Sequence, residues 1–242
     1  MRGLPEIREG DDLARLISGA CPTPISSTDT LVVAHKVVSK AEGRTRALSE
    51  VRPGERALAL AGEHGKDARV VQVILDESAE ILRADAGRLI CQTHHGLVCA
   101  NAGVDASNTA SDDEVVLLPL DPDRSARAMR DALHAETGAW PAVLISDSFG
   151  RAWRLGQTDV AIGAAGISPL EDWRGREDSR GRKLSATMIA VADSTAAAAD
   201  LARTKDGRQP VVLVRGLGRW ISRKHGPGAA ALRRPLAEDL FR

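Results

Sequence analysis

The chain alternates between short, continuous apolar runs and longer stretches in which apolar residues recur at helical spacing. Three continuous runs predict strands, namely TLVVA from residue 30, PAVLIS from residue 141 and QPVVLV from residue 209. The first is β-branched and uninterrupted, which is typical of a strand buried on both faces of a sheet. The second leads into the mostly polar stretch SDSFGR. Shorter strands are predicted in RLICQT and GLVCANAG, joined by a His-His-Gly turn, and in DEVVLLPL.

Helical patterns occupy much of the remaining chain. Apolar residues recur at helical spacing in residues 10–20, 54–65 and 68–78. A further helix is predicted from Asp121, a suitable N-cap followed by Pro122, to Gly138. The Ala-rich residues 186–207 predict one long helix, with a strand at its start as an alternative. Strands and helices alternate without a regular βαβ repeat, so the sequence predicts an α+β fold rather than a doubly wound sheet.

Composition limits the classes of function. The 242 residues contain 33 basic and 33 acidic side chains, no Tyr, two Phe and four Trp. A balanced charge and few aromatic rings argue against a nucleic-acid-binding protein. The N-terminus lacks an apolar signal region, and no apolar stretch reaches the roughly 20 residues that span a bilayer. We therefore expect a cytoplasmic protein without a membrane partner, formed as one domain over residues 1–242 or as two interleaved subdomains.

The cysteines raise the question of a zinc site. Cys91, His94, His95 and Cys99 lie within nine residues, but their spacing departs from the usual C-x2-4-C zinc patterns. Both cysteines also fall at apolar strand positions, where small buried cysteines are common. An odd total of three cysteines argues against a disulfide framework. We therefore expect Cys91 and Cys99 to be buried strand residues.

Polar residues that follow the apolar strands are the better candidates for chemistry. Asp105 and Asp147 each follow an apolar run, with Asn108 and Ser148 nearby. Two carboxylates from separate strand ends are a typical oxygen site for Mg²⁺ or Mn²⁺, with phosphate oxygens completing the coordination. Lys40 and Arg44 follow another strand and could neutralise a polyphosphate. The alternative is that NAGVDASN, residues 101–108, is only an Asx-rich turn.

Several longer segments resemble one enzyme family. The segments GLPEI, HKVVSKAEGR, NAGVDASN, SDSFGRAWRLGQTDVAIGAAGI, DWRGREDSRGRKLSATMIAVAD and PVVLVRGLG occur in this order along the chain. Together they are similar to the coenzyme F420-0:L-glutamate ligases, the γ-glutamyl ligases, from about Leu4 to the final EDLFR. Actinobacterial bifunctional members continue into a second domain after a similar segment, so we expect a stand-alone ligase or a ligase domain ending at that junction.

The resemblance implies a fold, a reaction and partners. The implied fold is a mixed-sheet α+β γ-glutamyl ligase fold with intertwined subdomains in a homodimer. The implied reaction uses GTP to convert the terminal carboxylate of F420-0 into an acyl phosphate, which the amine of L-glutamate attacks, with further γ-linked glutamates as an extension. GDP and phosphate are released. The implied cofactors are Mn²⁺ or Mg²⁺, with K⁺ as a further candidate cation. Positioning and charge neutralisation do the catalytic work, without a protein nucleophile.

The family's site residues correspond to particular positions in this sequence. The resemblance implies that Asp105, Asp147 and Ser148 bind metal and that Asp105, Asp147 and Lys40 are catalytic. The nucleotide contacts that it implies are Leu4, Pro5, Glu6, Ile7, His35, Lys40, Asn108, Arg203, Thr204, Lys205 and Asp206.

Two departures from the family pattern leave alternatives open. His35 stands where the family usually has Ser, and the Met/Lys-Gly-Lys/Gln/Glu element of the last nucleotide loop reads Arg203-Thr204-Lys205. A glycine that lets the backbone approach phosphate is therefore replaced by Thr, and a position that can bind a second metal is Lys. Asp206 could replace that ligand, or Lys205 could supply the charge itself. The alternatives are a related ligase with another carboxylate acceptor and an inactive nucleotide-binding partner.

Overall fold

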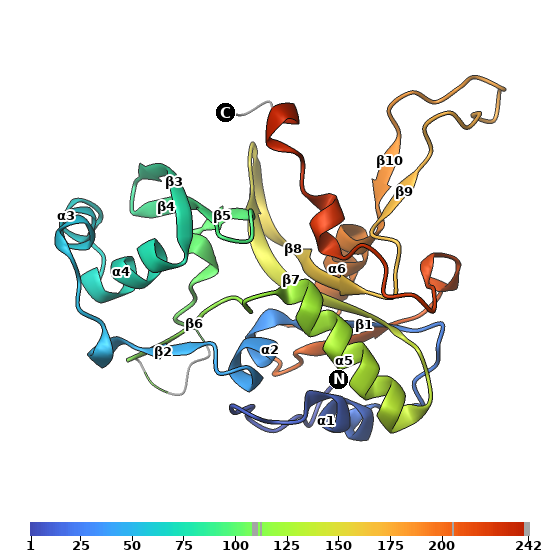
Figure 1. Ribbon diagram of the computed structural model, residues 1–242, viewed down its shortest axis with the longest axis horizontal. Helices are drawn as coiled ribbons and strands as arrows, with labels where there is room; N and C mark the ends of the chain where they lie inside the picture. Colours follow the sequence, from blue (N-terminus) through green and yellow to red (C-terminus); the bar gives the residue numbers. More distant parts are fainter. Residues whose placement is uncertain (108–110, 112, 205, 240–242) are drawn as a thin grey trace.

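The computed structural model describes residues 1–107, 111, 113–204 and 206–239, and its centre is a four-stranded mixed sheet (Figure 1). The strand order is β11-β1-β7-β8, in which β1 runs parallel to β7 while β11 and β8 pair antiparallel to their neighbours. The bounds are β1 Thr30–Ala34, β7 Ala142–Arg151, β8 Arg154–Ala165 and β11 Val211–Val214. The prediction of an α+β fold with a mixed sheet is confirmed.

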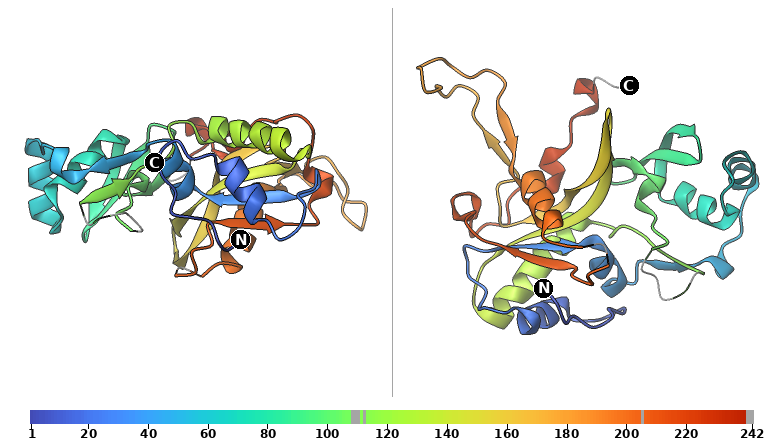
Figure 2. Two further views of the ribbon diagram at one scale, coloured as in Figure 1. Left: turned by 90° about the horizontal axis from the view of Figure 1, so that it is seen from below. Right: turned by 180° about the vertical axis from the view of Figure 1, so that it is seen from behind.

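Helices cover both faces of this sheet (Figure 2). Side chains alternate along β1, so Leu31 and Val33 pack into one hydrophobic cluster while Val32 packs into another. The first cluster also receives α1, α2 and α5, and the second receives α6 and the 3₁₀ helix η4. The bounds are α1 Leu13–Ala20, α2 His35–Ala41, α5 Pro122–Thr137, α6 Val191–Leu201 and η4 Ala229–Leu232. Burial on both faces explains why β1 is continuously apolar.

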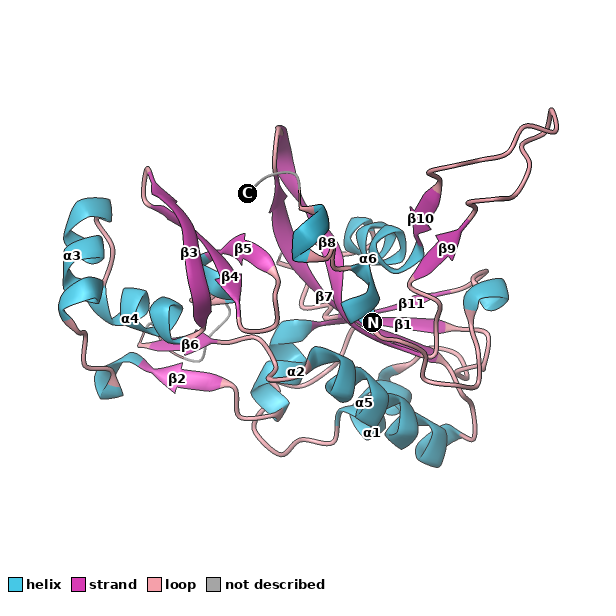
Figure 3. Cartoon of the chain, turned by 45° about the horizontal axis from the view of Figure 1, so that its top comes forward, coloured by secondary structure: helices cyan, strands magenta, loops and turns pink. Residues whose placement is uncertain are grey.

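A second lobe lies beside the sheet and has its own hydrophobic core (Figures 1 and 3). The antiparallel strands β2 and β6 lie where the chain enters and leaves it. Helices α3 and α4 pack on each other, and α4 packs on β3 of a three-stranded sheet of order β3-β4-β5. The bounds are β2 Thr45–Ala47, η1 Leu48–Glu50, α3 Glu55–His64, α4 Ala68–Asp76, β3 Ser78–Asp85, β4 Arg88–Thr93, β5 Val98–Ala100, η2 Asn101–Gly103 and β6 Glu114–Val116.

Two ribbons project from the main body (Figure 1). One is the far part of the β7–β8 hairpin, and the other is the charged segment between β9 and β10. The bounds of the remaining elements are β9 Leu170–Asp172, β10 Met188–Ala190, η3 Gly218–Trp220 and η5 Leu236–Glu238. Among the helices of the described residues, none combines the length and the apolar surface needed to cross a bilayer.

Most predicted elements are present, but the strands β2, β8 and β9 were not predicted, and three further elements differ. The Asp121 cap, Pro122 and Gly138 bound α5 as predicted, and a strand does precede the Ala-rich helix α6. The basic segment after β1 forms the helix α2, which the sequence analysis did not separate from the strand. Strand β3 was not predicted because its residues are mostly exposed and lack an apolar alternation. The run 113–120 was predicted as strand throughout, but only Glu114–Val116 forms one.

Two side chains of α5 hold the C-terminal segment against the sheet. The buried Asp123 carboxylate accepts hydrogen bonds from the backbone N–H groups of Ala164 at 2.8 Å, Ala229 at 2.6 Å and Ala230 at 3.1 Å. The buried Arg130 guanidinium donates to the backbone carbonyls of residues 141, 222 and 223. Burial lowers the pKa of Arg130. These bonds add to the backbone hydrogen bonds between Gly166 and residues 222 and 225, which join the same segment to the chain just after β8.

Replacing Asp123 should destabilise the protein. In the Asp123→Ala variant, buried N–H groups lose their acceptor, so we expect the free energy of unfolding to fall by about 3 kcal/mol. Urea denaturation measures this difference. The control is Asp131→Ala on the same helix, because the Asp131 side chain is 55% exposed and its ion pair with His225 spans 3.4 Å. Equal unfolding free energies for the two variants would contradict the anchoring role of Asp123.

The stretch NAGVDASN begins as a left-handed bend. Asn101, Ala102 and Gly103 have φ angles of 53°, 53° and 73°, and Asp105 then forms an isolated bridge with Val116. The Asp105 carboxylate accepts a hydrogen bond from the N–H of Ser107 at 2.5 Å, which makes an Asx-type turn. The turn interpretation is therefore confirmed for residues 101–107, while Asn108 lies outside the described residues.

Gly103 is required at this bend for two reasons. Its φ is positive, and a Cβ there would lie 2.7 Å from the Cγ of Leu118, which is buried. We expect Gly103→Ala to destabilise the protein by about 2 kcal/mol through backbone strain and overpacking. Gly10→Ala is the matched control, because Gly10 has φ of +83° but no atom of the described residues would lie within 4 Å of a Cβ added there. A urea midpoint for Gly103→Ala equal to that of Gly10→Ala would show that Leu118 imposes no constraint.

Candidate active site

One pocket of about 440 Å³ gathers most of the residues predicted from the sequence. It lies where residues 4–6, the β1–α2 junction, the polar part of β7 and the segment after α6 meet. The predicted residues that line it are Leu4, Pro5, Glu6, His35, Asp147, Ser148, Arg203, Thr204 and Asp206. The sequence positions are far apart, so the fold itself assembles this set.

Four other predicted residues stand outside the lining, and one of them, Arg44, instead pairs with Glu77 at 2.7 Å and donates to the backbone carbonyl of Leu118. Lys40 on α2 forms an ion pair with Glu6, which places its ammonium group next to a lining residue. Asp105 is connected to the pocket through Lys36, a lining residue. Ile7 does not line the pocket, because its side chain is buried in the hydrophobic core with 5% exposure. The predicted contacts Asn108 and Lys205 lie outside the described residues.

The junction of β1 and α2 brings His35 against Asp147. Because β1 pairs in parallel with β7, with Ala34 opposite Ser146, the next residue on each strand lies at the same edge of the sheet. His35 is 2% exposed, and its Nε2 lies 3.3 Å from Asp147 Oδ1 without the alignment of a hydrogen bond. Its Nδ1 lies 3.3 Å from the hydroxyl of Ser39. The imidazole thus packs against the carboxylate, and it is almost wholly buried although it contributes to the pocket lining.

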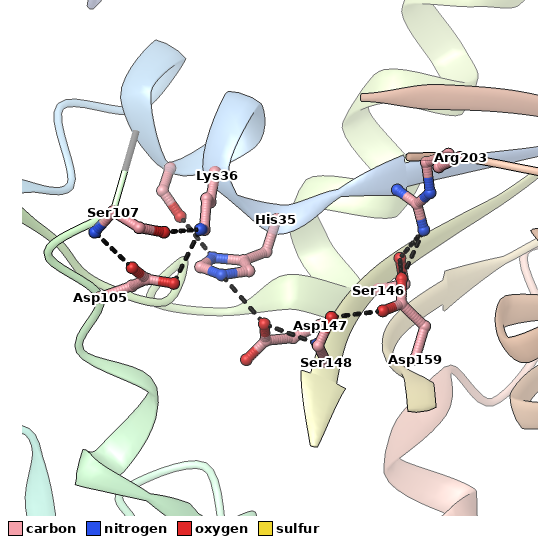
Figure 4. A network of polar contacts seen from close by, with 10 residues as sticks. His35, Lys36, Asp105, Ser107, Ser146, Asp147, Ser148, Asp159 and Arg203 are labelled. Atoms are coloured by element: carbon pink, nitrogen blue, oxygen red, sulfur yellow. Dashed lines mark hydrogen bonds and ion pairs between the residues drawn. The ribbon is translucent and has the colours of Figure 1, made fainter. Parts of the chain in front are cut away.

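Lys36 binds the other predicted carboxylate. Its Nζ lies 2.7 Å from Asp105 Oδ2 and donates to the hydroxyl of Ser107 at 2.7 Å (Figure 4). Burial alone would raise the pKa of Asp105, but the hydrogen bonds from Lys36 and Ser107 outweigh it and lower that pKa. Asp105 is therefore held as a carboxylate, paired with a cationic side chain that also reaches the pocket.

Asp159 joins β7, β8 and the segment after α6. Its carboxylate accepts hydrogen bonds from the hydroxyls of Ser146 at 2.8 Å and Ser148 at 2.7 Å, and it forms an ion pair with Arg203 (Figure 4). The sequence analysis missed Asp159 and gave Lys36 no site role. The available signal for Asp159 was a carboxylate directly before the apolar run VAIGAA of β8, but its partners come from other elements.

The residues around Asp147 suit a divalent cation that also binds phosphate. The N–H of Ser148 and the His35 ring both contact Oδ1 of Asp147, so Oδ2 is the oxygen that a ligand would meet. In the described part of the chain, no group of three His, Cys, Asp or Glu side chains is close enough to hold a metal on its own. Mg²⁺ usually takes only one or two carboxylates and completes its shell with water and substrate phosphates. Asp147 and Ser148, with Asp105 nearby, fit that pattern.

The cysteine and histidine residues considered for zinc have other environments. Cys91 and Cys99 face each other in the β4–β5 ladder, and both are buried as predicted. Burial raises the pKa of Cys99 to about 12, so its thiol is a poor metal ligand at neutral pH. The rings of His94 and His95 contact the backbone carbonyl oxygens of Asp76 and Pro119.

Comparison with known proteins gives one consistent family. The family model described as F420-0:Gamma-glutamyl ligase matches residues 3–216. Over 246 aligned positions the chain is 42% identical to the coenzyme F420:L-glutamate ligase of Methanothermobacter thermautotrophicus, covering 100% of this chain and 97% of the relative. The proteins of the same name from Methanopyrus kandleri and Archaeoglobus fulgidus are 44% and 45% identical, covering 98% and 90% of this chain and 94% and 86% of each relative.

These matches include the N-terminal segment, the β1–α2 junction, the polar part of β7 and the segment after α6, which are the parts of the chain that form the pocket. The chain therefore belongs to the F420-0:Gamma-glutamyl ligase family of enzymes.

Proposed function

We propose that this protein is a GTP- and divalent-metal-dependent ligase that forms an amide between L-glutamate and coenzyme F420-0. The observation that carries the proposal is the match, over almost the whole length of both chains, to relatives named coenzyme F420:L-glutamate ligase. The pocket supports it, because carboxylates, a hydroxyl and cationic side chains converge there. A ligase that activates a carboxylate with a nucleotide needs these groups and no nucleophile from the protein.

The cationic residues have a clear task in this reaction. Lys36, Arg203 and Arg208 line the pocket, and Lys40 is paired with the lining residue Glu6. Positive side chains stabilise the charge that spreads over the phosphate oxygens during phosphoryl transfer. The carboxylate oxygen of F420-0 attacks the γ-phosphorus and GDP leaves. The glutamate amine then attacks the acyl carbon, loses a proton and expels phosphate.

Asp147 and Ser148 would hold the divalent cation, and Asp105 would complete the protein's share of its ligands. When bound, Mg²⁺ or Mn²⁺ supplies Lewis-acid neutralisation of the phosphate oxygens. The Lys36 ammonium now occupies Asp105 Oδ2, so metal binding at Asp105 requires Lys36 to exchange its carboxylate partner for a phosphate. His35 packs against Asp147 and restricts the orientation of its carboxylate.

The direct test is an assay with F420-0, L-glutamate, GTP and Mn²⁺. We expect mass spectrometry to show F420-0 gaining one glutamate residue while one GTP is converted to GDP and phosphate for each amide formed. GTP conversion that requires some other carboxylate acceptor would point to a related ligase of different acceptor range, as the altered loop at Arg203 and Thr204 allows. Tight GTP binding without conversion under any acceptor would contradict the proposal and favour a nucleotide-binding partner.

Asp147→Asn tests the metal assignment. We expect kcat to fall by at least about 100-fold, because an amide is a far weaker ligand for a divalent cation than a carboxylate. Electron paramagnetic resonance of added Mn²⁺ should show weaker binding, and the thermal unfolding midpoint should stay close to that of the parent. Asp172→Asn is the control, since Asp172 pairs with Arg174 on the β9–β10 arm. Near-parental activity in Asp147→Asn would show that Asp147 is not a metal ligand.

A further inference from the structure

We propose that Asp159 is a positioning residue that fixes the Arg203 guanidinium and the Ser148 hydroxyl at the wall of the pocket. This inference concerns how the site is held together, and its catalytic consequence rests on the proposed function. Asp159 comes from β8, whereas the groups that it holds come from β7 and from the segment after α6. It therefore lies at the point where three parts of the chain meet.

The β7–β8 ladder sets the geometry of the serine contacts. Ser148 lies directly opposite Asp159 in the antiparallel register, and Ser146 is two residues away on the same face of β7. Both hydroxyls reach the carboxylate, Ser148 through Oδ1 and Ser146 through Oδ2. Asp147, between them, points to the other face and contacts His35. Because side chains alternate between the two faces of β7, Asp147 contacts His35 while Ser146 and Ser148 contact Asp159.

The Arg203 contact is a buried ion pair. The Asp159 side chain is 5% exposed and the Arg203 side chain 10%, and Nη2 of Arg203 also donates to Ser146 Oγ at 3.2 Å. Among the described residues, the buried Nε atom of Arg203 has no hydrogen-bond partner. Removing one member of such a pair leaves the other charge buried and uncompensated, so the remaining side chain is expected to leave its position. Arg203 is located in the lining only while Asp159 is charged and in place.

The same carboxylate orients the Ser148 hydroxyl. The hydroxyl donates its only proton to Asp159, so its oxygen can act toward a bound ligand only through its lone pairs. A hydroxyl group whose proton is engaged in a hydrogen bond to a carboxylate presents its oxygen lone pairs, which can face a cation or accept a hydrogen bond. Asp159 therefore acts on a bound metal–nucleotide complex only indirectly. It positions Arg203 for the phosphates and the Ser148 oxygen for the cation, while its own oxygens are occupied by donors from the protein.

Asp159→Asn is the informative variant. The asparagine amide keeps the shape of the side chain but has no negative charge. Its NH₂ group also faces Ser146, Ser148 or Arg203, which are themselves hydrogen-bond donors. In the protein without ligands, we expect faster amide hydrogen exchange in residues 206–212, which follow Arg203. With Mn²⁺ present, calorimetry should show GTP binding weakened by about tenfold. Asp193→Asn is the matched control, because Asp193 is a half-buried carboxyl that accepts from the N–H of Ala161 at 2.9 Å outside the pocket.

A double-mutant cycle separates positioning from general destabilisation. Arg203→Met alone should weaken GTP binding, and adding Asp159→Asn should cause a clearly smaller further loss than Asp159→Asn causes in the parent, because part of its effect passes through Arg203 and only the part that passes through Ser148 remains. Independent, multiplying losses would overturn the proposal, as would unchanged exchange in residues 206–212 or an equal effect of Asp193→Asn. If the parent protein failed to bind GTP, the proposed function would be wrong, while the exchange comparison would still decide whether Asp159 holds this segment.

Discussion

The parallel pairing of β1 with β7 is the constraint on which the site depends. It places Ala34 opposite Ser146, so that both strands reach the same edge of the sheet together. The chain then turns at once into α2, which delivers His35 and Lys36 to the polar part of β7. If β1 and β7 were antiparallel, one of these two polar segments would lie at the opposite edge of the sheet. Apolar burial on both faces of β1 and β7 makes this register costly to change, because a shift of one residue would exchange the two hydrophobic clusters.

Around this pairing, acids and bases are matched at short range. Lys36 is paired with Asp105, Lys40 with Glu6 and Arg203 with Asp159, and His35 packs against Asp147. Each pair joins different elements, so the charged groups help to hold the walls of the pocket together. The chain is neutral overall, with 33 basic and 33 acidic side chains, whereas the charged side chains that line the pocket are mainly acidic, with Glu6, Asp147, Asp159, Asp200 and Asp206 against Lys36, Arg203 and Arg208. An anionic nucleotide would therefore bind by exchanging partners with these side chains rather than by entering an unpaired positive cavity.

Local signals in the sequence predicted local structure well. The caps of α5, the doubly buried β1 and the buried cysteines of β4 and β5 depend on neighbouring residues and on simple periodicity. Candidate residues directly after an apolar run, such as Asp147 and Ser148, could be named for the same reason, although β7 continues past them to Arg151. Asp159 could not, since one carboxylate beside an apolar run gives no information about the serines and the arginine that surround it. The exposed strand β3 also escaped prediction, because it is held by backbone pairing with β4 rather than by an apolar face.

The two predicted metal-binding carboxylates are supported by different cores. Asp147 lies on the central sheet, whereas Asp105 follows the left-handed bend at the edge of the second lobe, whose core includes Ala102 and Val104. Lys36 connects them, because it extends from α2 on the sheet side to Asp105 and Ser107 (Figure 4). Without a nucleotide this ammonium group neutralises Asp105. Under the proposed function, phosphate oxygens offer Lys36 another partner and release Asp105 for the cation. Metal and nucleotide would then favour each other's binding, because each one removes the charge that opposes the other.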